Sequence, residues 1–321
     1  MKQAENFRIL VHTPAELATE YVAWAEHICN DPGITFGVPA IDRVMIPMRA
    51  GDLVSIIARP GHGKSSLLAY LARTQAKRIV ARGTTETEAV VYVTWEQSAE
   101  ELEAFFQSDG QYSVSDLAWG RAPMEFVYQQ AVRRGTLPVW TIGHGIGRIG
   151  AKMPRMTPEA VLGAIETMQA DFGVKPTLML FDYMQLIPIV GLSDRFQRVA
   201  EVPIRVKELA LRIGCPAVVG VQASRDVDER QCKIPEMRDA QLASTIEQTS
   251  DKAFGLWRPI LTEPPNCTLS IEGQSRVYTV NERLFFIRML KQRGDRGRYT
   301  WAMHFAPEYL RLAEIELAIK E

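Results

Sequence analysis

The sequence predicts an α/β fold: a mainly parallel sheet flanked by helices, with antiparallel strands at the C-terminal side. Strand-like apolar runs alternate with helical patterns through the central part of the chain. Such alternation is typical of parallel sheets, whose strands are connected through helices. One run leads through the loop ARPGHGKSS, residues 58–66, directly into a helix, as phosphate-binding loops do. The last third contains three further strand-like runs, which we expect to be antiparallel.

The N-terminal segment predicts a helix over residues 13–29. Thr13 is a suitable cap, Pro14 occupies the first helical position, and Glu16 completes a capping box. The apolar residues of this segment form a broad stripe, so the helix must pack against another surface. That surface is either its own domain or a neighbouring subunit, and the pattern alone does not distinguish the two.

The central and C-terminal elements follow from periodicity and turn signals. We expect buried strands at 52–58, 89–95, 177–187 and 215–224, and helices at 64–81, 99–106, 157–173 and 193–214. Pro203 lies inside the last of these helices and should kink it. Residues 107–156 show no regular pattern. The C-terminal strands are expected at 251–257, 283–292 and 298–305, with residues 260–282 as an insertion.

Composition indicates a soluble cytoplasmic protein without a membrane segment. The 321 residues are 46% hydrophobic and 23% charged, and the net charge of −1 gives no general support for nucleic-acid binding. The four cysteines are widely spaced and form no CxxC pair, which argues against a zinc site or a disulfide framework. The N-terminus lacks the apolar core of a signal peptide, and the most apolar stretch is too short to span a bilayer.

The loop at 58–66 predicts phosphate binding, although Ala58 stands where the usual pattern has its first glycine. Backbone N–H groups at the start of the following helix can cradle phosphates. Lys64 can reach the outer phosphates, and Ser65 can coordinate Mg²⁺. We therefore expect the nucleotide to be bound by Arg59, Pro60, Gly61, His62, Gly63, Lys64, Ser65 and Ser66.

Polar side chains end three other predicted strands. Asp182 follows a buried run and could share a Mg²⁺ with Ser65, or it could merely cap the next turn. Glu96 could orient and deprotonate an attacking water, or it could be a charge at a helix N-terminus. Gln222 could sense the state of the phosphates. Ligands of open α/β sheets bind at the carboxyl edge. The convergence of these residues at that edge is therefore stronger evidence for a binding site than any one of them.

The segment LKQRGDRGR, residues 290–298, is the densest basic stretch. It could be a solvated hairpin turn, since GDRG is a good turn sequence, or a nucleic-acid patch. It could also supply Lys291 and Arg293 to a neighbouring subunit's nucleotide site, as an arginine finger does. Composition cannot choose among these alternatives.

Taken together, these motifs resemble the ATPase domain of DnaB-type hexameric helicases, which has a RecA-like fold. ARPGHGKSS is similar to that family's ARPSMGKT, in which alanine at the first position is usual. TWEQSAEEL resembles FSLEMPAEQL, FDYMQLI resembles IDYLQLM, and VQASR resembles SQLNR. KIPEMRDAQLASTIEQTSD aligns with KRPVNSDLRESGSIEQDAD, and MLKQRGDRG resembles GKQRNGPIG. The resemblance covers roughly residues 32–312, with residues 260–282 unmatched.

The resemblance implies a role for each matched position. Lys64 and Ser65 would bind ATP phosphates and Mg²⁺, Asp182 would be the Walker B carboxylate, and Glu96 the catalytic base. Gln222 would be the γ-phosphate sensor. Lys291 and Arg293 would act in trans, which requires a homo-oligomer, in this family a hexamer. Residues 1–31 would then be an arm and a linker helix that docks on a neighbouring subunit, and residues 32–321 the ATPase domain.

Two departures from the family affect its partners. The family's N-terminal helical domain precedes the linker, whereas about a dozen residues precede Thr13 here. A loader or primase would therefore be a separate partner. The family's channel loop, which contacts single-stranded DNA, has Arg-Glu where this chain has Gln241-Leu242. Losing that arginine should weaken DNA binding and lower its salt dependence. Candidate DNA contacts in and around this loop are Arg225, Lys233, Arg238, Gln241, Ser244 and the basic segment 147–155.

We therefore expect an ATP-driven ring that moves on single-stranded DNA and unwinds duplex during replication. The alternative is a RecA-like ATPase that does not unwind, such as a recombination mediator or a regulatory ATPase. Such proteins share the loop and Asp182 but normally lack the STIEQ and KQR segments, whereas the near-neutral charge and Gln241 favour them. A nucleotide-binding module without turnover is disfavoured because Glu96 and Arg293 are both present.

Overall fold

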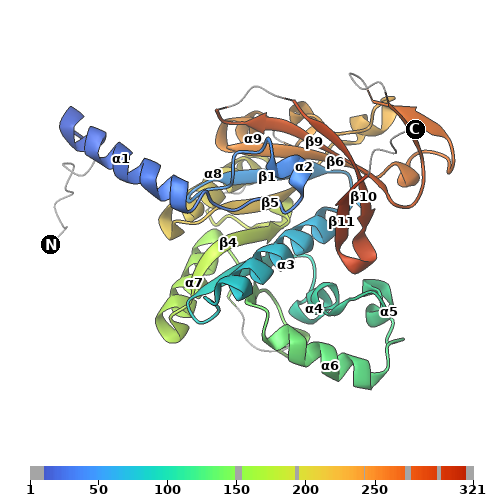
Figure 1. Ribbon diagram of the computed structural model, residues 1–321, viewed down its shortest axis with the longest axis horizontal. Coiled ribbons are helices and arrows are strands. Elements are labelled where there is room, and N and C mark those ends of the chain that lie inside the picture. The colour runs from blue at the N-terminus through green and yellow to red at the C-terminus, as the bar shows by residue number, and fades with distance from the viewer. Residues whose placement is uncertain are drawn as a thin grey trace.

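The computed structural model describes residues 11–148, 154–191, 195–241, 243–271, 276–294 and 298–315. Its centre is a nine-stranded sheet in the order β11-β10-β9-β6-β1-β5-β4-β2-β3 (Figure 1). The predicted fold class is confirmed: the strands from β6 to β3 in this order are parallel, and β9, β10 and β11 form an antiparallel edge.

The strands of this sheet are β1 (Leu53–Ala58), β2 (Glu88–Thr94), β3 (Val139–Ile142), β4 (Lys175–Asp182), β5 (Ala217–Gln222), β6 (Lys252–Trp257), β9 (Leu284–Gln292), β10 (Thr300–Ala306) and β11 (Arg311–Glu314). The helices are α1 (Pro14–Asn30), α2 (Pro39–Asp42), α3 (Lys64–Arg82), α4 (Ala99–Gln107), α5 (Val114–Ala118), α6 (Met124–Gly135), α7 (Pro158–Phe172), α8 (Arg195–Ile213) and α9 (Ala243–Thr249). Pro203 lies inside α8, as the sequence indicates.

One expectation about the C-terminal strands was wrong. Residues 251–257 were predicted to be part of an antiparallel group, but β6 runs parallel to β1 and is antiparallel only to β9. The reason is the connection: α9 lies between β5 and β6 and returns the chain to the same end of the sheet, as a parallel pairing requires. The antiparallel part of the sheet therefore begins at β9.

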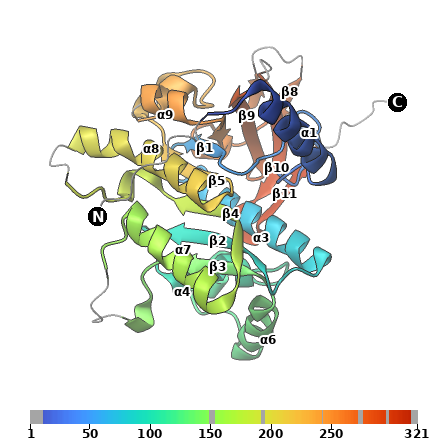
Figure 2. The ribbon, with the colours of Figure 1, turned by 90° about the vertical axis from the view of Figure 1, so that its left-hand side faces the viewer.

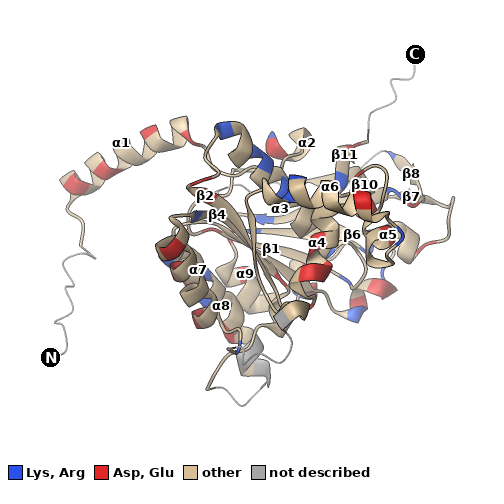
Figure 3. Ribbon diagram, turned by 90° about the horizontal axis from the view of Figure 1, so that it is seen from below, with Lys and Arg blue, Asp and Glu red and all other residues tan. Residues whose placement is uncertain are grey.

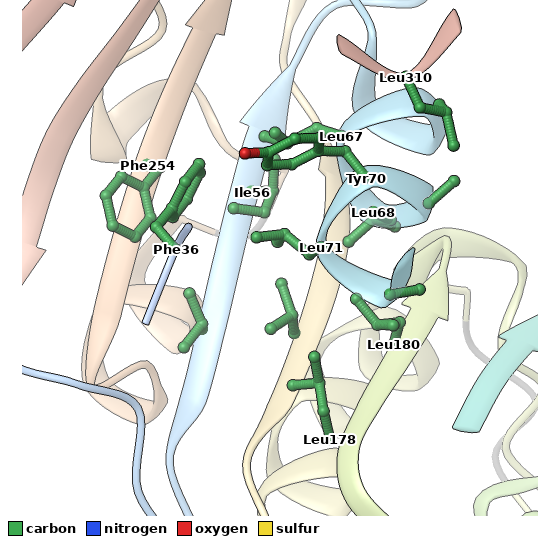
Figure 4. Packing of buried hydrophobic residues seen from close by; sticks show 14 of the residues in the cluster. Phe36, Ile56, Leu67, Leu68, Tyr70, Leu71, Leu178, Leu180, Phe254 and Leu310 are labelled. Atoms are coloured by element: carbon green, nitrogen blue, oxygen red, sulfur yellow. The ribbon is translucent and has the colours of Figure 1, made fainter. Parts of the chain in front are cut away.

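Two apolar layers fill the space between the sheet and its helices. Along β1 the side chains alternate: Ile56 packs toward α3 and Phe254, whereas Ile57 packs toward α7 and α8. Figure 4 shows the first layer, in which Leu67, Leu68 and Leu71 of α3 lie over the sheet. On the other face α7 and α8 lie side by side (Figure 2). This two-sided burial explains why the strand sequences are almost continuously apolar.

Within residues 107–156 the described chain forms α5, α6 and β3, which were not predicted. β3 is a four-residue strand at the edge of the sheet. A strand this short cannot establish an alternating pattern. In α6 the apolar positions Met124, Tyr128 and Val132 are four residues apart, which is helical spacing, and in the structure these side chains are exposed.

Helix α1 begins as predicted, with Thr13 and Glu16 forming a reciprocal capping box. No residue of α1 is buried, and the helix projects away from the sheet (Figure 1). Leu17, Tyr21 and Trp24 are all about half exposed or more. Within the described chain, therefore, the apolar stripe of α1 is not covered by the domain to which α1 is attached.

The segment between β6 and β9 leaves the main sheet. It starts with a 3₁₀ turn at Pro259–Leu261 and contains the hairpin of β7 (Thr268–Ser270) and β8 (Val277–Thr279), which form a separate two-stranded sheet. Ile271 packs in a small apolar cluster with Trp257 and Phe286. Among the described residues, no helix combines the length and the apolarity that a membrane crossing requires.

Candidate functional site

The loop at residues 59–63 connects a buried strand to a long helix. β1 ends at Ala58, and α3 starts at Lys64. Gly61 and Gly63 have φ angles of 79° and 86°, which only glycine adopts without strain. A Cβ atom on Gly63 would also lie 3.0 Å from the ring of Phe305. The first turn of α3 thus presents its free N–H groups to the solvent side, where phosphates can bind.

A cleft of about 480 Å³ opens over this loop at the carboxyl edge of the parallel strands. The register aligns these ends, because Thr94 pairs with Asp182 and Ala58 pairs with Gln222. The cleft is lined by Pro60, Gly61, Gly63, Lys64, Ser65, Ser66, Glu96, Gln97, Phe105, Tyr183 and Gln222. The loop, the glutamate and the glutamine singled out from the sequence therefore line one cleft, at the strand end where Asp182 also lies.

Asp182 lies at the floor of the site, with 2% of its surface exposed. Its Oδ2 accepts a hydrogen bond of 2.9 Å from the Tyr92 hydroxyl. Burial raises the pKa of Asp182, and the neighbouring hydroxyls of Ser65 and Tyr92 and the Lys64 ammonium oppose that rise. The buried Oδ1 has no hydrogen-bond partner among the described residues. A cation beside it would satisfy both the charge and the free oxygen.

These residues fit a Mg²⁺ ion bound together with a nucleotide. The described part of the chain contains no group of three or more His, Cys, Asp or Glu residues that could hold a metal by itself. Mg²⁺ commonly takes only one or two protein ligands and completes its shell with phosphate oxygens and water. Ser65 and Asp182 are of that kind.

Lys64 is partly buried between two carboxylates. Its ammonium donates a hydrogen bond of 3.5 Å to the Ala58 carbonyl and lies 5.8 Å from the centre of the Tyr183 ring. Burial lowers the pKa of Lys64, while the charges of Asp182 and Glu96 raise it. A phosphate arriving in the cleft would add the negative charge that keeps this lysine protonated.

Glu96 was expected at the end of a strand. It lies two residues beyond Thr94, where β2 ends, so it belongs to the loop that follows. Its side chain is exposed at the mouth of the cleft. Burial and the nearby Asp182 charge raise the pKa of Glu96, and Lys64 lowers it. A carboxylate with a raised pKa is a stronger base, which suits proton abstraction from water.

Gln222 ends β5 beside the loop. Its backbone N–H donates to the Gln185 side-chain oxygen at 3.3 Å, and its side chain lines the cleft. The backbone N–H of Gln241 in turn donates to the Gln222 carbonyl at 3.4 Å. Gln222 therefore lies between the nucleotide cleft and the segment that precedes α9.

Two side chains of the loop point away from the cleft. The Arg59 guanidinium forms an ion pair with Asp228 at 2.9 Å and donates to the Ala223 carbonyl at 3.2 Å. The His62 ring is 5% exposed, and its Nδ1 accepts a hydrogen bond of 3.0 Å from the backbone N–H of Arg258. Both side chains fasten the loop to neighbouring segments, and neither residue is among those that line the cleft.

Lys291 and Arg293 lie at the opposite edge of the sheet from the cleft. The Arg293 backbone N–H bonds to the Asp251 carbonyl, and the Asp251 N–H bonds to the Leu53 carbonyl. Leu53 begins β1 and Ala58 ends it at the phosphate loop. At the usual rise of a strand these two residues are separated by roughly 16 Å. The Arg293 side chain is 68% exposed and pairs with Asp251 at 3.1 Å, and Lys291 donates to the Glu247 carbonyl.

The candidate DNA-binding residues differ in their surroundings. Arg225, Gln241 and Ser244 are exposed. Arg238 is also exposed, and its guanidinium pairs with Glu236 at 3.1 Å. Lys233 is mostly buried in an ion pair with Glu263. Leu242 and most of the basic segment 147–155 fall outside the described residues.

Several residues of the site were not identified from the sequence. Tyr92 holds Asp182, Tyr183 and Phe105 line the cleft, and Asp228 holds Arg59. Strand alternation places Tyr92 on the same side of β2 as Thr94, but it places Val90 there as well, so it does not single out Tyr92. No local pattern marks Asp228 as the partner of Arg59.

Comparison with known proteins adds a family. Residues 33–314 match the family model described as DnaB-like helicase C-terminal domain. The chain is 28% identical over 294 residues to the replicative DNA helicase DnaC of Bacillus subtilis (strain 168), covering 88% of this chain and 57% of that protein. It is 28% identical over 235 residues to the replicative DNA helicase DnaB of Geobacillus stearothermophilus, covering 70% of this chain and 47% of that protein. The chain thus spans about half the length of these curated relatives.

Two solved structures share the fold. One is described as an ATPase domain, with a TM-score of 0.72 and 17% identity over 95% of this chain and 100% of that one. The other is described as the structure of a DnaB-like replicative helicase and its interactions with primase. It has a TM-score of 0.72 and 18% identity, covering 96% of this chain and 69% of that one.

Proposed function

Because the chain belongs to the family of DnaB-like helicase C-terminal domains, we propose that it is an ATP-hydrolysing motor. In this proposal it forms a ring, moves along single-stranded DNA and unwinds duplex during replication. The observation that supports the motor best is the separation of two half-sites. The phosphate loop, Glu96 and Gln222 line one cleft, whereas Lys291 and Arg293 lie at the far edge of the sheet.

In the nucleotide half-site the residues have distinct roles. The N–H groups at the start of α3 and the Lys64 ammonium hold the phosphates of ATP. Ser65 and Asp182 hold Mg²⁺, which neutralises charge on the phosphates when it is bound. Glu96 orients a water molecule and accepts its proton, aided by its raised pKa. Gln222 reports the presence of the outer phosphate to the segment before α9 through its contact with Gln241.

The other half-site acts on a neighbouring subunit. Lys291 and Arg293 are too far from their own loop to reach its phosphates, but in a ring they can face the next subunit's cleft. A cation placed there stabilises the charge that develops during phosphoryl transfer. The homo-oligomer we propose is a hexamer, as in the DnaB-type helicases that the motifs resemble.

Two exposed apolar stripes support docking between subunits. α1 carries Leu17, Tyr21 and Trp24, and α6 carries Tyr128 and Val132, all of them exposed. Contiguous exposed apolar surface of this kind marks an interaction site. We infer that α1, as the linker helix, docks on the α6 stripe of the next subunit, so that residues 11–31 join neighbours and the following residues form the ATPase domain.

DNA would be contacted near the segment that precedes α9. Arg225, Arg238, Gln241 and Ser244 are exposed there and can donate to phosphate oxygens. Lys233 is less suitable because it is paired with Glu263. The ion pair of Lys233 with Glu263, and Gln241 at the position where the family has arginine, also favour the second candidate function. That function is a RecA-like ATPase that does not unwind. A separate loader or primase remains part of the proposal for the helicase.

The proposal is tested by comparing the chain with its Lys64→Ala variant. The variant should lose ATP hydrolysis by about 100-fold or more, because a lysine that stabilises the transition state is missing. Strand displacement should be lost with it. Native mass measurement with ATP, with and without a single-stranded oligonucleotide, separates the two candidates. A monomer under both conditions would contradict the ring motor, and a ring that ignores the oligonucleotide would favour the non-unwinding ATPase.

A further inference from the structure

A second cavity of about 530 Å³ lies away from the nucleotide cleft. It is lined by the middle of α3, the loop between α4 and α5, the helix α6 and residues 309–312 at the start of β11, and it shares no lining residue with the cleft. Four cationic side chains line it: Arg73, Lys77, Arg133 and Arg311. Figure 3 shows the basic positions of α3 beside α6. This basic cavity has no role in the hydrolysis proposed above.

The positive charges of the basic cavity outnumber its one negative charge, that of Asp109. The Arg73 guanidinium donates to the carbonyls of Tyr309 and Leu310 at 2.7 and 2.5 Å, and carbonyls carry no net charge. Within the described part of the chain, none of the four cations forms an ion pair with a carboxylate. Like charges gathered around one pocket repel one another, and an anion placed among them relieves that repulsion.

Asp109 is the acidic residue that lines the cavity, and its oxygens are already engaged. Its Oδ1 accepts from the backbone N–H groups of Gln111 and Tyr112 at 2.7 and 3.2 Å. Its Oδ2 accepts from the Gln130 amide at 3.1 Å. Asp109 thus holds the loop after α4 in shape and leaves the cations available to a ligand.

The protonation of the cations agrees with this geometry. Burial lowers the pKa of Arg73, and repulsion from Arg311 lowers it further. Burial also lowers the pKa of Lys77, and repulsion from Arg73 adds to it. Arg73 is therefore near enough to both Arg311 and Lys77 for their charges to repel it. A cavity lined by charges of one sign concentrates ions of the opposite sign.

We propose that the basic cavity binds a small, multiply charged phosphate anion, of the class of oligophosphates and the phosphate groups of nucleotides. Arginine guanidinium groups match the geometry of phosphate oxygens, and lysine adds a point charge. A pocket of about 530 Å³ has the size of a small-molecule site, which favours a compact anion over the extended backbone of a nucleic acid. The site is separate from the ATP cleft, so its existence does not depend on the motor function.

The test uses inorganic tripolyphosphate and the Lys64→Ala chain, in which the ATP cleft is impaired. Calorimetric titration at physiological salt should show one site for each chain. The double variant Lys77→Gln/Arg133→Gln should weaken binding about tenfold or more, because two charge-assisted contacts are lost. Arg73 is left intact because it also holds the Tyr309 and Leu310 carbonyls.

A control of equal charge is Lys175→Gln/Arg212→Gln, at two exposed positions outside the basic cavity. It should leave the affinity for tripolyphosphate unchanged. Equal losses in both double variants would overturn the proposal, because they would show only a general effect of charge. The proposal would also be overturned if the cavity variant bound a single-stranded oligonucleotide more weakly but kept its affinity for tripolyphosphate. Failure of the motor proposal would change neither result, since hydrolysis is not measured.

Discussion

At the scale of single residues, His62 shows that a side chain in the phosphate loop can make a structural contact where a ligand contact was expected. Its sequence position predicts closeness to phosphate, yet its ring is buried and its Nδ1 accepts the Arg258 N–H. Burial lowers the pKa of His62 from 6.5 to about 4, against the opposing charge of Asp228. The neutral ring therefore fastens the phosphate loop to the segment after β6.

This burial predicts a pH dependence of stability. Because the pKa is lower in the folded state than in the unfolded state, the unfolded chain binds the proton first as pH falls from 6.5 toward 4. The free energy of unfolding should fall over that window, by up to about 3 kcal/mol from His62 alone. His62→Asn keeps an acceptor for Arg258 but does not titrate, so urea unfolding at several pH values should show a smaller slope.

Substituting the exposed His304 by Asn is the control and should leave the slope of the parent chain unchanged. His62→Gln places its acceptor one bond further from the backbone and should weaken nucleotide binding more than His62→Asn does. An unchanged slope in His62→Asn would show that the ring is not held neutral in the fold.

The residues of the candidate site could be predicted where a strand or motif defines them. Lys64 and Ser65 follow from the loop pattern, and Asp182 and Gln222 from their places at strand ends. Tyr92, which holds Asp182, could not be ranked above other strand residues without its contact. Arg59 was expected to bind nucleotide, but its guanidinium is engaged by Asp228.

At the scale of elements, α1 and α6 carry apolar stripes that the described chain leaves exposed. Exposed substitutions usually change the free energy of unfolding by less than about 0.5 kcal/mol. Tyr21→Ser in α1 and Val132→Ser in α6 should therefore leave the melting temperature nearly unchanged. Each should nevertheless raise the protein concentration needed for ring assembly about tenfold, because interface anchors dominate association. Sedimentation with ATP measures that concentration.

Glu26→Ser is the matched control, since Glu26 lies on the opposite side of α1 from Leu17 by helical spacing. It should not change assembly. If the α1 and α6 variants assembled like the parent chain, docking of these two stripes on each other would be wrong.

Elements with strong periodicity or clear caps were predictable, and the others were not. The capping box at Thr13 and the helix after the phosphate loop appear where expected. β3 was missed because it has only four residues, whereas α6 was missed although Met124, Tyr128 and Val132 have helical spacing. The direction of β6 was wrong because strand direction depends on the connection through α9.

At the scale of the whole molecule, the sheet separates the two halves of the proposed catalytic site. Mixing two inactive variants tests this arrangement. Lys64→Ala chains keep Arg293, and Arg293→Ala chains keep the phosphate loop, so neither forms an active interface alone. In rings that contain both, roughly a quarter of the interfaces should combine an intact loop with an intact arginine, and ATP hydrolysis should return toward that fraction.

Mixing Lys64→Ala chains with the double variant Lys64→Ala/Arg293→Ala is the control and should restore nothing. Arg293→Ala alone should still bind nucleotide, as a fluorescent ATP analogue can report. Full hydrolysis by Arg293→Ala chains would contradict the role of Arg293, and no recovery in the mixture would contradict its action in trans.

The sequence by itself determined the alternation of the other strands and helices, the phosphate loop and the strand ends that meet at one edge, but not α5, α6 and β3. These features depend on local spacing, caps and the alternation of apolar residues, all of which are visible in neighbouring positions. Only the tertiary structure decided where His62 and Arg59 point, which way β6 runs, and that Arg73 and Arg311 share a cavity. Such contacts join residues far apart in the chain, as between His62 and Arg258, and no local pattern records which distant residue will complete a hydrogen bond or face a like charge.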